Sequence, residues 1–312
     1  MRLIFADDGR FIKWNYYIPL ALLVPAAVVS AALAKVHKGV RIGLGVALLA
    51  LAVPALHHEQ PRLLIVPAPA PIIPADGSAF RVMTYNVEGY HGGEQRVLDF
   101  IGESQPDILC LVEGTFANRA PPNVVKTLGD KYHWAVGERL SIASRYPIKE
   151  SKVLKRTYGR IIMRAVVDVE GQDVAVILAD IWVPRLRIED QVFPELGAFV
   201  EMETGPVVLT GDFNTPRGSV WIARATAGMD DALLHEGAPR YLATWPSYFP
   251  LWQIDHMFAG NGLKVLDAEI PHRWGSDHFP LLVTLQLPGK SASAKTAPKP
   301  VKSPSQKRAR QR

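Results

Sequence analysis

The segment VVLTGDFN, residues 207–214, decides the fold of this chain of 312 residues. Its apolar beginning, residues 207–209, predicts a buried strand, and the polar residues after it are typical of a turn. Because residues two apart in an extended segment point the same way, Asp212 and Asn214 are expected to bring two polar groups to one site. The segment therefore predicts a strand with functional groups at its end.

Strand-like and helix-like patterns alternate on both sides of this segment. The order of these elements predicts an α/β (α+β) fold in which two packed sheets are flanked by helices. The helix-like runs are residues 94–104, 124–131, 189–203 and 219–227, and the strand-like runs are residues 80–86, 107–112, 141–145, 161–169, 173–178, 207–209, 253–258, 263–268 and 280–285.

Polar residues accompany several of the other predicted strands. Carboxylates and amides at strand ends, in a chain with one cysteine, suit a hard divalent cation such as Mg²⁺, and such an ion favours phosphate substrates. Each residue alone is also typical of a turn, a cap or a solvated surface, so the prediction depends on the ordered set. Besides Asp212 and Asn214, the set contains Asn86, Glu88, Glu113, Asp255, Asp277 and His278.

Read in order, these segments resemble the endonuclease/exonuclease/phosphatase superfamily over residues 79–288. The resemblance implies a four-layered α/β sandwich and a metal-dependent hydrolase of phosphoric esters. The motifs that carry it are YNVEG at 85–89, DILCLVE at 107–113, SRYPI at 144–148, GDFN at 211–214, QIDHMF at 253–258 and GSDHFP at 275–280.

The resemblance also implies a metal site. It makes Glu113 the principal ligand and places Glu88 and Asp277 near the ion, either directly or through water. The implied cofactor is Mg²⁺, with Mn²⁺ as the alternative.

The resemblance further implies the catalytic roles. Asn86 and Asn214 hold phosphate oxygens or orient the nucleophile, and Asp212 lies beside the attacking water. His278, oriented by Asp255, acts as a general base or as a charged stabiliser of the transition state.

One segment, VILADIWVPR, departs from the family pattern. Asp180 and Trp182 stand where family members often carry Asn-x-His, and an indole is neither a base nor a cation. Arg185 and Arg187 are predicted to replace the missing positive charge and, with Trp182, to bind substrate. The departure leaves open a non-catalytic binding or adaptor domain.

The charge is unevenly distributed along the chain. The whole chain carries a net charge of +5, with +4 in residues 1–62 and +8 in residues 290–312, so residues 63–289 carry −7. An acidic body argues against a domain that wraps nucleic acid and favours a lipid-derived or small phosphorylated substrate. A metal-dependent endonuclease or exonuclease, with nucleic acid as substrate, stays the alternative.

Residues 1–62 are predicted to form a membrane anchor. Residues 14–34 contain no charged side chain and residues 42–58 are similarly apolar, which predicts a transmembrane helical hairpin. A buried hairpin in a soluble protein and a cleaved signal peptide are the weaker alternatives. In a further alternative, the helix pair and the tail act as a scaffold in the cell envelope.

The anchor predicts where the rest of the chain lies. Lys35, Lys38 and Arg41 between the spans favour a cytoplasmic connector and an extracytoplasmic catalytic domain, although the basic residues before the first span favour the reverse. Residues 63–78 contain prolines typical of an extended linker. Residues 289–312 are predicted to be a disordered basic tail that binds anionic lipid or an envelope polymer, or only aids solubility.

Overall fold

A computed structural model describes residues 78–289, apart from residues 116–117, 158–159, 183–188, 236–240 and 274. The predicted membrane spans and basic tail, nearly all of the linker, and Arg185 and Arg187 lie outside the described residues and stay predictions. No helix in the described part of the chain combines the length and the apolar character that a membrane span requires.

The first of two six-stranded sheets contains both parallel and antiparallel neighbours. Its order is β11-β12-β1-β2-β4-β3, with β1 and β2 parallel to each other at its centre. The strands are β1 (Ala79–Asn86), β2 (Ile108–Val112), β3 (His133–Gly137), β4 (Leu140–Ser144), β11 (Lys264–Glu269) and β12 (Leu281–Gln286).

The second sheet has the order β5-β6-β7-β8-β10-β9, and β7 and β8 form its parallel pair. Its edge strand β5 exposes mostly charged side chains, and an exposed charged strand of this kind discourages pairing with another chain. The strands are β5 (Ile148–Thr157), β6 (Arg160–Val169), β7 (Gln172–Ile181), β8 (Val207–Asp212), β9 (Asp230–Asp231) and β10 (Asp255–Gly260).

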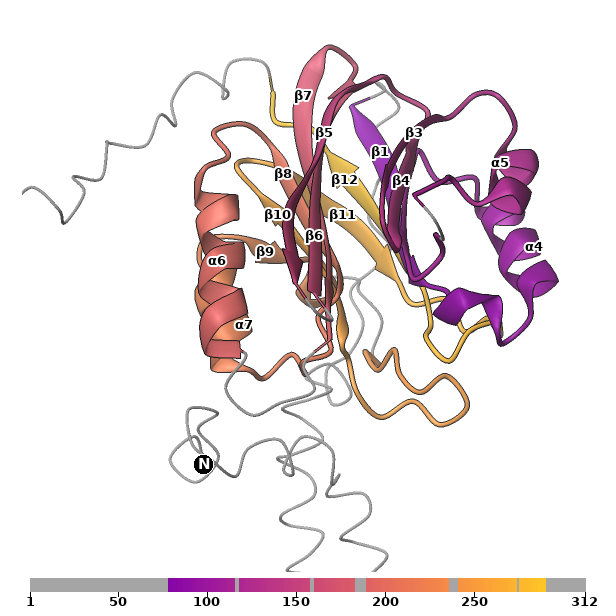
Figure 1. The fold of residues 1–312 in the computed structure, drawn as a ribbon. Helices are drawn as coiled ribbons and strands as arrows, with labels where there is room; N and C mark the ends of the chain where they lie inside the picture. The colour runs from indigo at the N-terminus through magenta and orange to yellow at the C-terminus, as the bar shows by residue number, and fades with distance from the viewer. Residues whose placement is uncertain are drawn as a thin grey trace, which may run out of the picture.

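Helices cover the outer face of each sheet (Figure 1). Helices α4 (Glu94–Ser104) and α5 (Pro122–Leu128) pack on the first sheet, and α6 (Glu189–Glu201) and α7 (Val220–Ala225) pack on the second. A third hydrophobic cluster fills the space between the sheets. The remaining short helices are η1 (Glu88–Tyr90) and η2 (Ala232–Leu234).

This arrangement confirms the predicted sandwich of two packed sheets flanked by helices. Three strands were not predicted: β3, β5 and β9. Strands β3 and β5 lie at sheet edges and alternate poorly between apolar and polar residues, and β9 has two residues. Periodicity finds strands that have one buried face, so edge strands of this kind escape it.

Candidate active site

Strand pairing aligns three carboxylates across the second sheet. Asp180 of β7 lies opposite Asp212 of β8, and Asp212 lies opposite Asp255 of β10. Residues paired in this way point to the same face of a sheet. Since Leu178 and Met257, two positions away, belong to the core between the sheets, the carboxylates also point between the sheets. All three are buried at one edge of the sandwich.

The first sheet brings its polar residues to the same edge. Asn86 ends β1 opposite Val112 of the parallel strand β2, so Glu113 follows at the end of the neighbouring strand. The two sheets are joined there, because the Asn86 side-chain Nδ2 donates to Asp212 Oδ2 at 3.0 Å. Residues from motifs far apart in the sequence therefore meet in one site.

The GDFN motif has a geometric requirement for its glycine. Gly211 has a φ of +133°, and a Cβ there would lie 2.0 Å from the Ala179 carbonyl oxygen. The next residue, Asp212, accepts hydrogen bonds from the Asn214 backbone N at 2.8 Å and the Asn214 Nδ2 at 2.9 Å. Together with Asn86, these donors fix the Asp212 carboxylate in one orientation.

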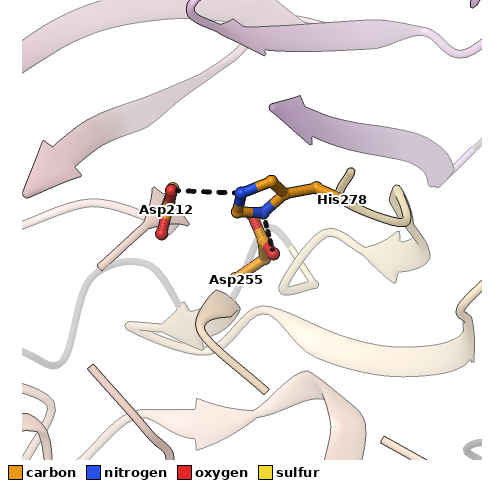
Figure 2. A group of neighbouring side chains, drawn as sticks. All are labelled: Asp212, Asp255 and His278. Atoms are coloured by element: carbon orange, nitrogen blue, oxygen red, sulfur yellow. Dashed lines mark hydrogen bonds and ion pairs between the residues drawn. The ribbon is translucent and has the colours of Figure 1, made fainter. Parts of the chain in front are cut away.

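His278 completes a buried group that we call the histidine cluster, made of Asp212, Asp255 and His278 (Figure 2). His278 Nδ1 donates to Asp255 Oδ2 at 2.8 Å, which turns Nε2 toward Asp212 Oδ2, 3.8 Å away. Ser276 fixes the turn before the histidine: its Oγ donates to the Asn86 carbonyl at 2.7 Å and accepts from His278 N at 3.1 Å. The sequence analysis assigned no role to Ser276.

Electrostatics favour a charged imidazole in this cluster. Burial lowers the pKa of His278, but the carboxylates of Asp255 and Asp212 outweigh it and raise the pKa to about 10. Burial raises the pKa of Asp212 well above its usual range, and the neighbouring Asp255 and Asp180 carboxylates raise it further. The cluster therefore retains a proton near neutral pH.

His256 differs from His278 in its surroundings. It points to the other face of β10, where its ring lies 5.1 Å from that of Phe213 and its Nε2 donates to the Thr215 carbonyl at 2.9 Å. Burial lowers its pKa. These contacts give His256 a structural role.

Two predicted metal ligands lie in contact beside the histidine cluster. Burial raises the pKa of the Glu88 carboxyl, and the adjacent Asp277 carboxylate raises it further. The Gly89 N donates to the Glu113 carbonyl at 3.1 Å, which brings the third predicted ligand next to Glu88. The Trp245 Nε1 donates to Asp277 Oδ2 at 2.8 Å and fixes that carboxylate.

These donors fit a hard divalent cation. Glu88, Glu113 and Asp277 offer carboxylate oxygens, the ligands that Mg²⁺ and Mn²⁺ prefer. The histidine cluster also brings three ligand atoms within 4.8 Å of one another. It fits a cation less well, because His278 Nδ1 already donates to Asp255 and Asp212 already accepts from two asparagines.

Three of the predicted site residues have an uncommon backbone conformation. Glu88, Glu113 and Asn214 have φ values of 48°, 56° and 46°, a region that non-glycine residues seldom adopt. Strain of this kind collects at functional sites, where the surrounding structure enforces it.

Arg139, which the sequence analysis did not single out, links Asp180 to Glu113. Its Nη2 lies 2.5 Å from Asp180 Oδ2 and its Nη1 lies 3.4 Å from Glu113 Oε1. Burial raises the pKa of Asp180 to about 7, although Arg139 acts in the opposite direction. Trp182, two residues later, is 44% exposed beside this pair. No sequence signal distinguishes Arg139 from other arginines in hairpin turns.

The chain matches the family model described as Endonuclease/Exonuclease/phosphatase family over residues 83–278. The chain belongs to this family. The match runs from β1 to His278 and so spans every predicted site residue. Members of the family are in general metal-dependent hydrolases that act on phosphoester bonds.

Two similar proteins come from bacteria. The uncharacterized protein YbhP of Escherichia coli (strain K12) is 24% identical over 246 residues, covering 67% of this chain and 97% of YbhP. The UPF0294 protein VV2535 of Vibrio vulnificus (strain YJ016) is 33% identical over 100 residues, covering 30% of this chain and 32% of that protein.

Solved structures show the same fold. D. rerio TDP2 in complex with a single-strand DNA product has a TM-score of 0.55 at 16% identity, covering 67% of this chain and 99% of that chain. An endonuclease/exonuclease/phosphatase from Beutenbergia cavernae DSM 12333 has a TM-score of 0.51 at 19% identity, covering 68% and 72%. These likenesses confirm the α/β sandwich.

Proposed function

We propose that the chain is a membrane-anchored, Mg²⁺-dependent phosphoesterase that hydrolyses a phosphodiester or a phosphomonoester. The observation that carries the proposal is the hydrogen bond from Asn86 of one sheet to Asp212 of the other, beside the Asp255–His278 pair. This arrangement brings the proposed catalytic groups of four motifs to a single edge of the sandwich, next to the carboxylates suited to a cation.

Glu113, Glu88 and Asp277 would hold the ion, Mg²⁺ or Mn²⁺. A divalent cation at these carboxylates neutralises phosphate charge and lowers the pKa of a bound water. Trp245 keeps the Asp277 carboxylate oriented toward that task.

The chain's own residues position the water and the phosphate. Asp212, held by Asn86 and Asn214, accepts a proton from the water as its oxygen bonds to phosphorus. The amide groups of the two asparagines lie beside that carboxylate and orient the phosphate oxygens. His278, oriented by Asp255, presents Nε2 on the same side and stabilises the negative charge that develops. The ester bond opposite the water breaks, and the leaving oxygen takes a proton from solvent.

A lipid-derived or small phosphorylated substrate is favoured. The net charge of −7 over residues 63–289 and the predicted anchor support this choice, with the domain placed outside the cytoplasm. Protease accessibility of the domain in intact cells, compared with lysed cells, tests that placement.

Two alternatives rest on specific observations. A nuclease is supported by the shared fold with TDP2, whose structure contains a DNA product. A non-catalytic binding or adaptor domain is supported by Asp180 and Trp182 at the usual Asn-x-His positions.

Hydrolysis by the full-length chain tests the proposal. The substrates are bis-p-nitrophenyl phosphate, p-nitrophenyl phosphate, sphingomyelin and plasmid DNA, each with Mg²⁺ or with chelator. We expect Mg²⁺-dependent turnover that Glu113→Gln abolishes and that Glu103→Gln, an exposed acid on α4, leaves unchanged. We also expect Mg²⁺ to raise the melting temperature of the wild type but not of Glu113→Gln.

The outcomes separate the hypotheses. Turnover of plasmid DNA alone favours the nuclease. A folded chain that binds Mg²⁺ and hydrolyses none of the substrates contradicts the phosphoesterase and favours the adaptor.

A further inference from the structure

A cavity of about 680 Å³ opens beside Glu113, and neither Asp277 nor His278 lines it. Its walls come from the turn between β3 and β4, from the ends of β5 and β6, and from the residue after β7. Its volume lies within the range of roughly 300–1,000 Å³ typical of ligand pockets. We call it the arginine pocket, after the residues that line it: Glu113, Glu138, Arg139, Arg156, Arg160 and Trp182.

Two of its three arginines already have carboxylate partners. Arg139 lies between Asp180 and Glu113, and the Arg156 Nη2 lies 2.9 Å from Glu138 Oε1. Three guanidinium groups and the carboxylates of Glu113 and Glu138 line the cavity, and the Asp180 carboxyl lies behind Arg139.

Arg160 is different. Its Nε is buried and has no hydrogen-bond partner within residues 78–289 as described, and the same residues offer its guanidinium no ion pair. Other cations of the same two strands, Lys149, Lys155 and Arg164, each lie 2.5–2.9 Å from a carboxylate oxygen. A buried donor without an acceptor is unfavourable, so Arg160 keeps a hydrogen-bonding capacity that an oxygen of a ligand can satisfy.

We propose that the arginine pocket binds a second phosphate group of the substrate, next to the phosphate that is hydrolysed. The planar guanidinium groups of Arg160 and Arg139 match the oxygens of a phosphate in bidentate geometry. Glu113 lines the pocket and is also a proposed metal ligand, so the two phosphate positions adjoin. The inference rests on the proposed function for the first phosphate only.

The exposed indole of Trp182 fits the same ligand. It forms part of the pocket wall and is 44% exposed, so it offers an apolar surface to the organic part that joins the two phosphates. The substrate class is therefore an organic compound with two phosphates. The compound that carries the two phosphates is either a phosphorylated oligonucleotide or a small bisphosphate.

Binding of inorganic phosphate to the full-length chain in chelator tests the pocket without turnover. Titration calorimetry of the wild type is expected to show phosphate binding that Arg160→Gln weakens at least about tenfold, the loss of one charge-assisted hydrogen bond. Lys152→Gln removes an equal charge from an exposed position of β5 and is expected to change nothing. Equal binding by wild type and Arg160→Gln, or no binding by either, overturns the proposal.

Kinetics with Mg²⁺ then identify the source of the second phosphate. A thymidine dinucleotide with and without a 5′-phosphate forms one pair of substrates, and a sugar bisphosphate and its monophosphate form the other. In one pair, the second phosphate is expected to lower the KM of the wild type about tenfold. Arg160→Gln is expected to remove that advantage, and Lys152→Gln is expected to keep it. An Arg160→Gln variant that keeps the advantage overturns the proposal.

The two experiments also separate this inference from the proposed function. If the wild type hydrolyses none of the substrates but binds phosphate through Arg160, the result supports the phosphate-binding pocket and contradicts the phosphoesterase. If it hydrolyses substrates but does not bind phosphate through Arg160, the result supports the phosphoesterase and contradicts the phosphate-binding pocket.

Discussion

The histidine cluster and the arginine pocket adjoin the same carboxylates but are built differently. In the cluster, Asp212, Asp255 and His278 are buried, and hydrogen bonds from both sheets fix them. In the pocket, Arg139 and Trp182 are 38% and 44% exposed, and Arg139 contacts Asp180 and Glu113 through its guanidinium group. The first region is rigid and closed, whereas the second is open and charged.

In the proposed function, the buried histidine cluster carries out the reaction and the open arginine pocket recognises the substrate. Groups that move protons depend on orientation within a fraction of an ångström, which burial and multiple hydrogen bonds provide. Groups that recognise a substrate have only to present charge and surface at an accessible wall. Of the two residues that depart from the family pattern, Trp182 lines the arginine pocket and Asp180 lies between the two regions, so neither belongs to the histidine cluster.

The largest expected effect comes from removing the imidazole of the cluster. His278→Ala is expected to lower kcat on the preferred substrate by about 10²–10⁴-fold, because the charge that faces Asp212 and the phosphate is lost. Steady-state kinetics measure the effect, with His133→Ala, an exposed histidine of β3, as the matched control. A His278→Ala variant within tenfold of the wild type contradicts the division into a reacting and a recognising region.

Much of the fold was predictable from the sequence because the central strands bury both faces. Strands β1, β2, β7, β8 and β12 consist of apolar runs between turns, and the amphipathic helices α4 and α7 carry clear patterns. The edge strands β3, β5 and β9 were not predictable, because exposure and sheet pairing determine their residues more than a core does. The edge strand β11 was predicted, at residues 263–268.

The two regions of the site differ in the same way. The residues of the histidine cluster lie in short ordered motifs, so a resemblance identifies them. Arg139 and Trp245 act through partners far away in the sequence, Asp180 and Asp277, and no local pattern marks such contacts. In the aromatic segment at residues 241–252, Trp245 contacts Asp277, whereas Tyr248 and Phe249 are 70% and 61% exposed. The sequence of the segment does not distinguish these residues.

A second prediction concerns stability at the border of the two regions. The pKa of Asp180 is about 7 in the folded chain against an ordinary value of 3.8, because the carboxyl is buried. Between those pH values the unfolded chain releases the proton while the folded chain keeps it, so the wild type loses stability as the pH rises from about 4 to 7. Asp180→Asn has no proton to release and keeps its stability.

We expect the advantage of Asp180→Asn in free energy of unfolding to grow by about 3 kcal/mol from pH 4 to pH 7 and to level off above about pH 8. Urea unfolding at several pH values measures it. Asp173→Asn, an exposed carboxylate on the same strand, serves as control and is expected to show little change. An Asp180→Asn advantage that does not grow with pH contradicts a protonated Asp180 and assigns the residue to a permanent ion pair with Arg139.

The smallest expected effect tests whether the metal site belongs with the rigid region. Trp245→Phe removes the Nε1–H that donates to Asp277 Oδ2 and leaves a ring in the same place. Outer contacts of this kind contribute about 10–100-fold to metal affinity, so Mg²⁺ is expected to bind roughly tenfold more weakly. The Mg²⁺ dependence of the melting temperature measures this without reference to activity. Trp252→Phe, whose ring lies 5.4 Å from that of Trp245, controls for the change in stacking. Equal Mg²⁺ affinity in the wild type and Trp245→Phe would mean that Asp277 needs no fixed orientation, so the metal site would resemble the arginine pocket more than the histidine cluster.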